Sequence, residues 1–225
     1  MRIGLVCPYS FNVPGGVQAH VLDLATQLRE LGHHTEVLGP ASEAVELPEW
    51  LTRGGIAVPV RYNGSVARLS FGPQVRRTTR QFIERGNFDI LHVHEPNSPS
   101  YSMAALRMAA GPIVATYHAS AESSYALKIA LPALRGSLEK IRAGIAVSEE
   151  AWRWQSQQVG TDPVIIPNGV DTGRFAAARR IPGNQARPEV VFLGRLDEPR
   201  KGLDVFLQAI EQLPTMPRVT VIGAG

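Results

Sequence analysis

The sequence predicts an α/β protein built from Rossmann-like βαβ units. Short runs of aliphatic and β-branched residues alternate with longer segments whose apolar residues recur at helical spacing. The expected strands are 2–7, 35–39, 89–93, 113–117, 143–147, 164–166, 190–193 and 219–222. The expected helices are 16–31, 73–85, 99–109, 123–142, 149–159 and 202–213. This alternation is typical of a parallel sheet with helices on both faces.

The first βαβ unit carries the clearest signals. Its strand, RIGLVC over 2–7, is followed at once by Pro8. In the segment 16–31, Val17, Val21 and Leu24 recur at helical spacing, and Gly32 supplies a stop.

The bulk composition excludes several classes of protein. Of the 225 residues 44% are hydrophobic and 19% charged, which suits an ordinary globular core. A single cysteine, Cys7, allows no intramolecular disulfide and fits a reducing compartment. The first apolar run is too short for a signal peptide, and none approaches the roughly 18–20 residues of a membrane span. With a net charge of only +3, attraction to an anionic surface must come from local clusters.

The pattern divides the chain into two unequal parts. Residues 1–175 read as an N-terminal Rossmann-like domain, and 176–188 (AAARRIPGNQARP) as a linker without periodicity. Residues 189–225 restart with one βαβ portion of a second domain. One such unit alone does not cover both faces of its strands, so we expect the sequence to be a fragment of a longer protein.

A glycine-containing loop, 8–16 (PYSFNVPGG), joins the first strand to its helix. Ligands of open α/β sheets bind at the carboxyl ends of strands. Gly15 and Gly16 would let backbone N–H groups approach a phosphate at a helix N-terminus. The loop matches neither the dinucleotide fingerprint nor a Walker loop, and the alternative is a plain tight turn.

Three histidines follow or end predicted strands. His92 and His94 are two residues apart and share one face of a strand. A zinc site would need a third ligand, for which His118 is a candidate, and hydrogen-bonded core histidines are the favoured alternative. His118 follows the strand 113–117 and could orient a substrate hydroxyl, with a purely structural histidine as the alternative. We therefore predict no metal ligands.

Two groups of cations are candidates for binding anions. Arg195 follows a strand, and Arg200 and Lys201 open the next helix, an arrangement suited to a diphosphate. The alternative is a solvated basic turn. The second group lies on the helix 73–85, where a stripe could contact anionic lipid headgroups or be only a solvated face. It comprises Arg76, Arg77 and Arg80, interspersed with Thr78, Thr79 and Gln81. No basic–aromatic interleaving or nucleic-acid module is present, so no nucleic-acid partner is expected.

Several segments resemble the retaining glycosyltransferases of the two-Rossmann (GT-B) architecture, group 1 family. They are MRIGLVCPYSFNVPGGVQAHVLDLA, YNGSVARLSFGP, LHVHEPNSPS, ATYHAS, IPNGVD and FLGRLDEPRKGLDV. IPNGVD and the segment around Arg195 are shared across the wider family. The glycine loop with Tyr9 and Gln18, and the segment YNGSVAR, are more specific and are similar to actinobacterial phosphatidylinositol mannosyltransferases.

That resemblance implies transfer of mannose from GDP-mannose to the inositol of phosphatidylinositol, with retention of configuration. It implies that Gly16 approaches the donor diphosphate and that His118, with Arg195 and Lys201, acts at the reaction centre. Arg195, Arg200 and Lys201 would bind the donor and neutralise the leaving group. The acceptor-binding residues implied are Tyr9, Gln18, Tyr62, Asn63 and Arg68. No tightly bound cofactor is expected, and any Mg²⁺ would not be held by protein ligands.

The same resemblance sets expectations for location and activity. The protein would be cytoplasmic and peripheral on the inner face of the plasma membrane, with Arg76, Arg77 and Arg80 on the anionic surface. The family's second domain continues well beyond 225, so the isolated chain is expected to show little or no turnover. The open alternatives are a related transferase with another donor or acceptor and a non-catalytic phosphoinositide-binding module. A sugar-nucleotide epimerase is disfavoured by the segment 62–68.

Overall fold

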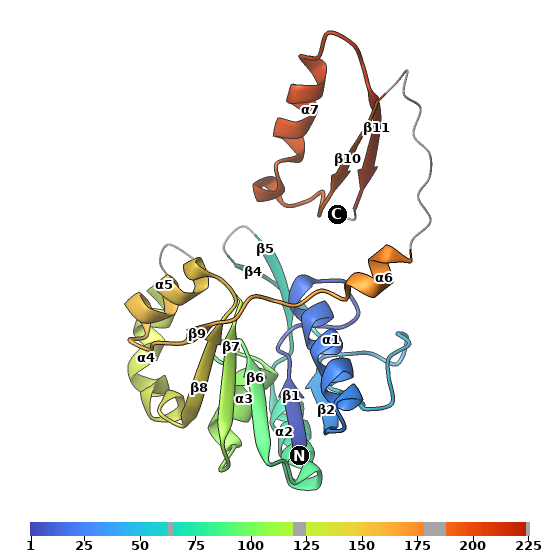
Figure 1. The fold of residues 1–225 in the computed structure, drawn as a ribbon. Helices are drawn as coiled ribbons and strands as arrows, with labels where there is room; N and C mark the ends of the chain where they lie inside the picture. The colour runs from blue at the N-terminus through green and yellow to red at the C-terminus, as the bar shows by residue number, and fades with distance from the viewer. Residues whose placement is uncertain (63–64, 119–124, 178–187, 224–225) are drawn as a thin grey trace. The chain divides into compact units, whose positions relative to one another are not determined.

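A computed structural model describes residues 1–62, 65–118, 125–177 and 188–223 (Figure 1). The chain forms two compact units. The first comprises Met1–Val60 and Ala67–Val170, and the second comprises Arg61–Val66 and Asp171–Gly225. Each unit is described by itself.

The first unit is built on a seven-stranded sheet of order β3-β2-β1-β6-β7-β8-β9, whose neighbouring strands are all parallel. Its strands are β1 (Arg2–Val6), β2 (His34–Gly39), β3 (Leu51–Arg53), β6 (Ile90–His94), β7 (Ile113–Tyr117), β8 (Ile141–Ala146) and β9 (Val164–Ile165). The helices are α1 (Gly16–Glu30), α2 (Pro73–Gly86), α3 (Tyr101–Met108), α4 (Tyr125–Leu138) and α5 (Glu149–Gln158). The predicted α/β fold with a parallel sheet is confirmed.

The sheet has a hydrophobic cluster on each face. Alternate residues of β1 divide between them: Leu5 belongs to the cluster with Val21 of α1, and Val6 to the cluster with Phe82 of α2 and Leu106 of α3. A parallel sheet buried on both faces explains why its strands read as nearly continuous apolar runs.

Three short strands were not predicted from the sequence. These are β3, β4 (Val58–Tyr62) and β5 (Ser65–Leu69), of which β4 and β5 form a separate two-stranded sheet. The strand β3 pairs with β2 through only a few residues, Val37 to Gly39. Such short pairings leave little periodicity in the sequence.

The prediction of one helix over 123–142 is wrong at its end. The helix α4 ends at Leu138, and β8 begins at Ile141, which pairs with Ile113 of β7. Between them Lys140 donates hydrogen bonds of 3.0 Å to the carbonyl oxygens of Arg107 and Ala109. Strand pairing and this side-chain clamp end the helix earlier than its periodicity indicates.

The second unit contains one parallel βαβ motif. It consists of β10 (Glu189–Leu193), a 3₁₀ turn η1 (Pro199–Lys201), α7 (Leu203–Glu211) and β11 (Arg218–Ile222), and β10 pairs with β11. Gly202, at φ 76°, ends η1 and precedes α7 in a left-handed conformation that glycine adopts without strain. A short helix, α6 (Thr172–Ala176), was not predicted. Most of the predicted linker, 178–187, lies outside the described residues.

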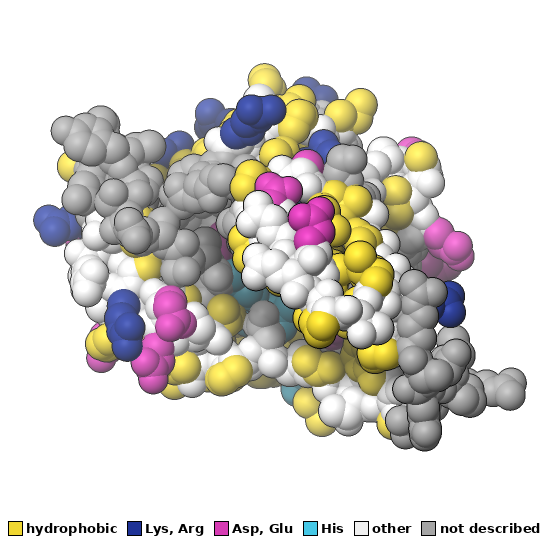
Figure 2. Space-filling view, turned by 90° about the horizontal axis from the view of Figure 1, so that it is seen from above, with side chains coloured by type: hydrophobic (Ala, Val, Ile, Leu, Met, Phe, Trp, Pro, Cys, Tyr) yellow, Lys and Arg dark blue, Asp and Glu magenta, His cyan; other side chains and the backbone are white. Residues whose placement is uncertain are grey.

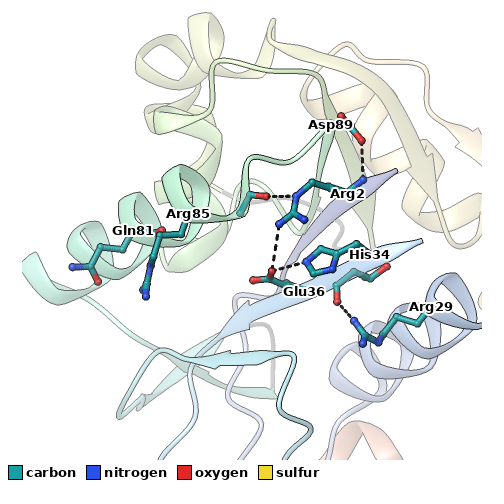
Figure 3. A network of polar contacts seen from close by, with 9 residues as sticks. Arg2, Arg29, His34, Glu36, Gln81, Arg85 and Asp89 are labelled. Carbon is teal, nitrogen blue, oxygen red and sulfur yellow. Dashed lines mark hydrogen bonds and ion pairs between the residues drawn. The ribbon is translucent and has the colours of Figure 1, made fainter. Parts of the chain in front are cut away.

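A polar network fastens the amino edge of the first sheet (Figure 3). Arg2 donates from Nε to the Gly86 carbonyl oxygen at 2.7 Å, and its backbone N–H donates to Asp89 Oδ2 at 2.7 Å. Glu36 Oε1 lies 2.8 Å from His34 Nε2 and 3.9 Å from Arg2 Nη2. This network ties β1 and β2 to the end of α2. It lies at the end of the strands opposite the glycine loop.

Replacing Gly39 tests the packing of that loop on the sheet. A Cβ there would lie 2.6 Å from Phe11 Cε2 and 3.0 Å from the Cys7 carbonyl oxygen, and a backbone atom cannot yield cheaply. We expect Gly39→Ala to lower the free energy of unfolding by about 1–3 kcal/mol. Urea unfolding measures this. Gly111→Ala, where a Cβ meets nothing within 4 Å, is the matched control and should leave stability unchanged.

Candidate functional site

The carboxyl ends of β1, β6 and β7 meet at one edge of the sheet because these neighbouring strands are parallel. The glycine loop leaves β1 at this edge and leads into α1 at Gly16. His94 ends β6, and His118 follows β7. Two regions singled out in the sequence, the glycine loop and the histidines, are therefore brought together by the fold.

The glycine loop is held in shape by Gln18. The Gln18 side-chain amide donates from Nε2 to the Ser10 carbonyl oxygen at 2.9 Å and to the Val13 carbonyl oxygen at 3.3 Å. Its Oε1 occupies the space where a Cβ on Gly15 would stand. A Cβ on Gly16 would meet nothing within 4 Å, so open space adjoins the first residue of α1. This leaves the helix N-terminus free to receive an anion.

Arg68 is joined to the same loop through the backbone. The Ser10 N–H donates to the Arg68 carbonyl oxygen at 3.1 Å. Arg68 and Tyr9 are both partly exposed. Among the described residues the Arg68 guanidinium makes no hydrogen bond or ion pair. Asn63 and the side chain of Tyr62 lie outside the described part of the chain.

The strand register explains why histidines gather beneath α1. Leu5 of β1 pairs with His92 of β6, and Leu5 belongs to the hydrophobic cluster on the α1 face. Since side chains alternate along a strand, His92 and His94 both face α1, whereas Leu91 and Val93 enter the opposite cluster. His92 Nε2 then lies 2.7 Å from Thr116 Oγ1.

A third histidine reaches the strand histidines from α1. The ring of His20 contacts the rings of His94 and His118 edge to face, at centroid separations of 5.7 and 5.2 Å. His94 Nδ1 lies 3.0 Å from His118 Nε2, and the His92 and His94 rings stack at 4.5 Å. In the view down onto this edge of the sheet, histidine side chains are visible in cyan (Figure 2).

Glu95 fixes the backbone at His118. The buried Glu95 carboxylate accepts a 2.5 Å hydrogen bond from the His118 N–H, and the Glu95 N–H donates to the Thr116 carbonyl oxygen at 2.8 Å. Glu95 itself has φ 49°, a left-handed conformation that costs energy for a non-glycine residue. Such strain persists where surrounding contacts enforce it, and it is concentrated at functional sites.

Burial keeps the imidazoles of this cluster neutral. It lowers the pKa of His92 to about 4 and that of His118 to about 3, with His20 as a further electrostatic contribution to both. Burial also places the pKa of His94 well below the ordinary value, and lowers that of His20. Neutral imidazoles can accept a proton or bind a metal ion through a free lone pair.

The histidine assignments from the sequence need one correction. His92 is a hydrogen-bonded core residue, as the favoured alternative held, and it does not belong to the group that could hold a metal. That group consists of His94, His118 and His20. The sequence analysis did not single out His20. His20 lies one helical turn after Gly16, and a residue there faces the same strand ends as the glycine loop.

The predicted anion-binding cations lie in the second unit. Arg195 forms a bidentate pair with Asp197, at 3.0 and 2.7 Å, and approaches Glu198 at 3.3 Å. Lys201 is exposed in η1, while the side chain of Arg200 lies outside the described part. Arg195 would therefore have to share its guanidinium between these carboxylates and a bound diphosphate.

The arginines of α2 form an exposed face. Arg76, Arg77 and Arg80 are exposed, whereas Thr78 and Thr79 are buried against the core. The threonines between the arginines in the sequence thus do not interrupt the basic face in space. Across the described residues, no helix combines the length and apolar character needed to span a membrane.

Comparison with known proteins identifies the family. The model of glycosyltransferase family 4 matches residues 14–174, which include the glycine loop's end, both strand histidines and His118. The chain belongs to glycosyltransferase family 4. This confirms the resemblance to the group 1 glycosyltransferases.

Curated relatives match the family 4 chain from end to end. It is 53% identical over 227 residues to the phosphatidyl-myo-inositol mannosyltransferase of Mycolicibacterium smegmatis, with 100% of this chain and 59% of the relative covered. The protein of that name from Propionibacterium freudenreichii is 40% identical, with 100% and 62% covered. A phosphatidylinositol N-acetylglucosaminyltransferase component from Arabidopsis thaliana is 27% identical, with 100% and 52% covered. The chain thus spans about three fifths of the first two relatives.

Solved structures agree on the fold. HepE from Anabaena, solved with UDP and glucose, superposes with a TM-score of 0.68 at 18% identity, covering 100% of this chain and 62% of that one. Sucrose-phosphate synthase from Thermosynechococcus elongatus gives 0.65 at 16% identity, covering 98% and 62%. The family 4 chain therefore has the fold of the N-terminal part of GT-B glycosyltransferases.

The buried histidines predict how stability depends on pH. Their pKa values are lower in the folded than in the unfolded chain, so the unfolded chain binds more protons as the pH falls below about 6.5. Stability should therefore be fully present above about pH 6.5 and decrease toward about pH 4, by up to about 1.4 kcal/mol per pH unit for each such histidine. Urea unfolding between about pH 7 and 5 measures the slope.

The variant His92→Gln isolates one of these groups. An amide can still reach the Thr116 hydroxyl but does not titrate, so the slope should become shallower by about one proton. His33→Gln, the same substitution at a histidine outside the cluster, is the control. An unaltered slope in His92→Gln would show that His92 is not held neutral by burial.

Proposed function

We propose that the whole protein carrying this chain transfers mannose from GDP-mannose to the inositol ring of phosphatidylinositol, with retention of configuration. The observation that carries the proposal is the 53% identity, along the entire chain, to relatives named phosphatidyl-myo-inositol mannosyltransferase. Residues 1–175 would bind the acceptor, 176–188 would be a linker, and 189–225 would begin the donor-binding domain.

The acceptor site in this proposal is formed by the glycine loop and β5. Arg68 would bind the lipid phosphodiester, since a half-buried guanidinium without a partner in the described part of the chain can bind an anion in bidentate fashion. Its backbone bond to Ser10 supports this role because it ties Arg68 to the loop that carries Tyr9. The remaining headgroup contacts would come from Tyr9, Gln18, Tyr62 and Asn63.

The donor would lie with its diphosphate at the N-terminus of α1. The open space beside Gly16 supports this, because backbone N–H groups there can approach a phosphate closely. His118 would act at the reaction centre as a neutral imidazole. Arg195, Arg200 and Lys201 would neutralise the departing diphosphate, with Lys201 the more available cation because Arg195 already pairs with Asp197.

A second candidate differs only in the donor. The Arabidopsis thaliana relative is named for a different sugar, N-acetylglucosamine, and for the same lipid, phosphatidylinositol. The acceptor is thus common to both names, and the donor is not. The second candidate is therefore transfer of another sugar to phosphatidylinositol.

The deciding assay supplies the whole protein with radiolabelled GDP-mannose and phosphatidylinositol in vesicles. Label should appear in the lipid with the anomeric configuration of the donor. GDP-mannose binding without labelled lipid would reject the mannosyltransferase. Labelled lipid obtained only with UDP-N-acetylglucosamine would favour the second candidate, and phosphatidylinositol binding without any transfer would favour a non-catalytic module.

Replacement of Arg68 tests the acceptor site. Loss of a charge-assisted contact costs about 1.5–3 kcal/mol, so Arg68→Ala should raise KM for phosphatidylinositol roughly 10- to 100-fold and leave KM for GDP-mannose unchanged. Steady-state assays with each substrate varied in turn measure both constants. Arg142→Ala, at the exposed start of β8, is the control. An equal loss for both substrates would contradict an acceptor role.

We further propose that α2 holds the protein on anionic membranes through Arg76, Arg77 and Arg80. At about 1 kcal/mol per residue, replacing all three by Gln should weaken binding to phosphatidylserine vesicles roughly 100-fold at low salt. Vesicle sedimentation measures this. The control neutralises three exposed arginines elsewhere: Arg107, Arg142 and Arg153. Equal losses in the two triple variants would mean that only net charge matters.

A further inference from the structure

Three histidine side chains from separate elements meet at the carboxyl edge of the first sheet. His20 comes from α1, His94 ends β6, and His118 follows β7. One ring nitrogen of each lies within 4.8 Å of those of the other two. The closest pair, His94 Nδ1 and His118 Nε2, is 3.0 Å apart. Nitrogens bound to one tetrahedral metal ion at about 2.0–2.1 Å are about 3.3 Å apart, so side-chain rotations would have to bring the most distant nitrogens closer by up to about 1.5 Å.

His94 would bind an ion through the nitrogen that faces His118. That nitrogen is Nδ1, which lies 3.0 Å from His118 Nε2. The other nitrogen, Nε2, makes no hydrogen bond within the described part of the chain, and His92 is not its partner because the two rings stack and His92 Nε2 is engaged by Thr116. An ion at Nδ1 leaves Nε2 as it is, so the proposal rests on the meeting of the three ring nitrogens.

We propose that His20, His94 and His118 form a binding site for a divalent transition metal ion of the Zn²⁺ class. Three imidazoles and no oxygen ligand suit Zn²⁺, Co²⁺ or Ni²⁺ and do not suit Mg²⁺ or Ca²⁺. The carboxylate of Glu95 accepts a hydrogen bond from the His118 N–H and would act from the outer shell by fixing the backbone of a ligand.

Such a site would have an open coordination position. Three protein ligands leave the fourth position of a tetrahedral ion for water or an anionic oxygen. His20 and His118 are only partly buried, so solvent reaches part of the cluster. On the proposed function, His118 also acts at the reaction centre, and a bound metal would occupy its lone pair. Metal binding and sugar transfer should then exclude each other.

Cobalt titration tests the site without any assay of activity. The metal-free 225-residue chain, carrying no polyhistidine tag, is titrated with Co²⁺ while the visible d–d absorption is recorded. We expect one Co²⁺ per chain, a tetrahedral spectrum, and displacement by Zn²⁺. His20→Gln should weaken Co²⁺ binding by roughly 10- to 100-fold or more. Removal of a residue that only supports a metal ligand already costs about that much affinity.

A matched control uses the histidines outside the cluster. His33 and His34 lie at the other end of the first βαβ unit, so the double variant His33→Gln/His34→Gln should bind Co²⁺ as the unaltered chain does. His20 is only half-buried, so its replacement should leave the far-ultraviolet circular dichroism unchanged, whereas replacing fully buried His94 risks the fold. Unaltered Co²⁺ binding in His20→Gln, or lost binding in the control, would overturn the proposal.

Inhibition of the whole protein is a separate measurement. Zn²⁺ at the concentration that saturates the site should abolish transfer, and His20→Gln should restore transfer in the presence of Zn²⁺. A Co²⁺ spectrum without inhibition would leave the metal site standing and overturn its overlap with the reaction centre. Absence of transfer even without metal would instead count against the proposed function.

Discussion

The parallel pairing of β1, β6 and β7 is the constraint on which the rest of the site depends. It brings the glycine loop, His94 and His118 to one edge, and its register decides which side chains face α1. With Leu5 paired to His92, both strand histidines turn toward α1 and away from the cluster that contains Val93. A slip of one residue would exchange those faces and bury imidazoles among aliphatic side chains.

The fold was predictable from two signals in the sequence. Parallel strands are buried on both faces of the sheet and therefore appear as continuous apolar runs, whereas the helices that cover the sheet show apolar residues every three to four positions. Prediction failed where tertiary contacts outweighed local pattern. The run ending at 142 looks helical, yet Ile141 pairs with β7 and Lys140 holds the carbonyl groups of α3's last turn. Short strands such as β3 depend on pairing with a neighbour and have no signature of their own.

The candidate site was predictable in its backbone and less so in its side chains. Strand ends, glycines and the topology of α/β sheets lead to the loop before Gly16 and to His118. They do not reveal that His20 belongs to the site, because the sequence of a helix does not show which strand residues one of its histidines contacts. Nor do they reveal the bidentate pair of Arg195 with Asp197. That pair depends on how two side chains, two residues apart in a turn, are oriented, and the sequence does not give this orientation.

The two roles proposed for the histidine cluster rest on a single physical cause. Removal of the imidazoles from water lowers their pKa values and so keeps His118 neutral, the form that a sugar-binding reaction centre can use as a hydrogen-bond partner. The same neutrality leaves lone pairs available to a transition metal. On the two proposals, a site that buries several imidazoles to hold one in place would acquire metal affinity as a by-product. The two proposed roles differ in what the lone pair of His118 contacts: the reacting sugar in one, the metal ion in the other.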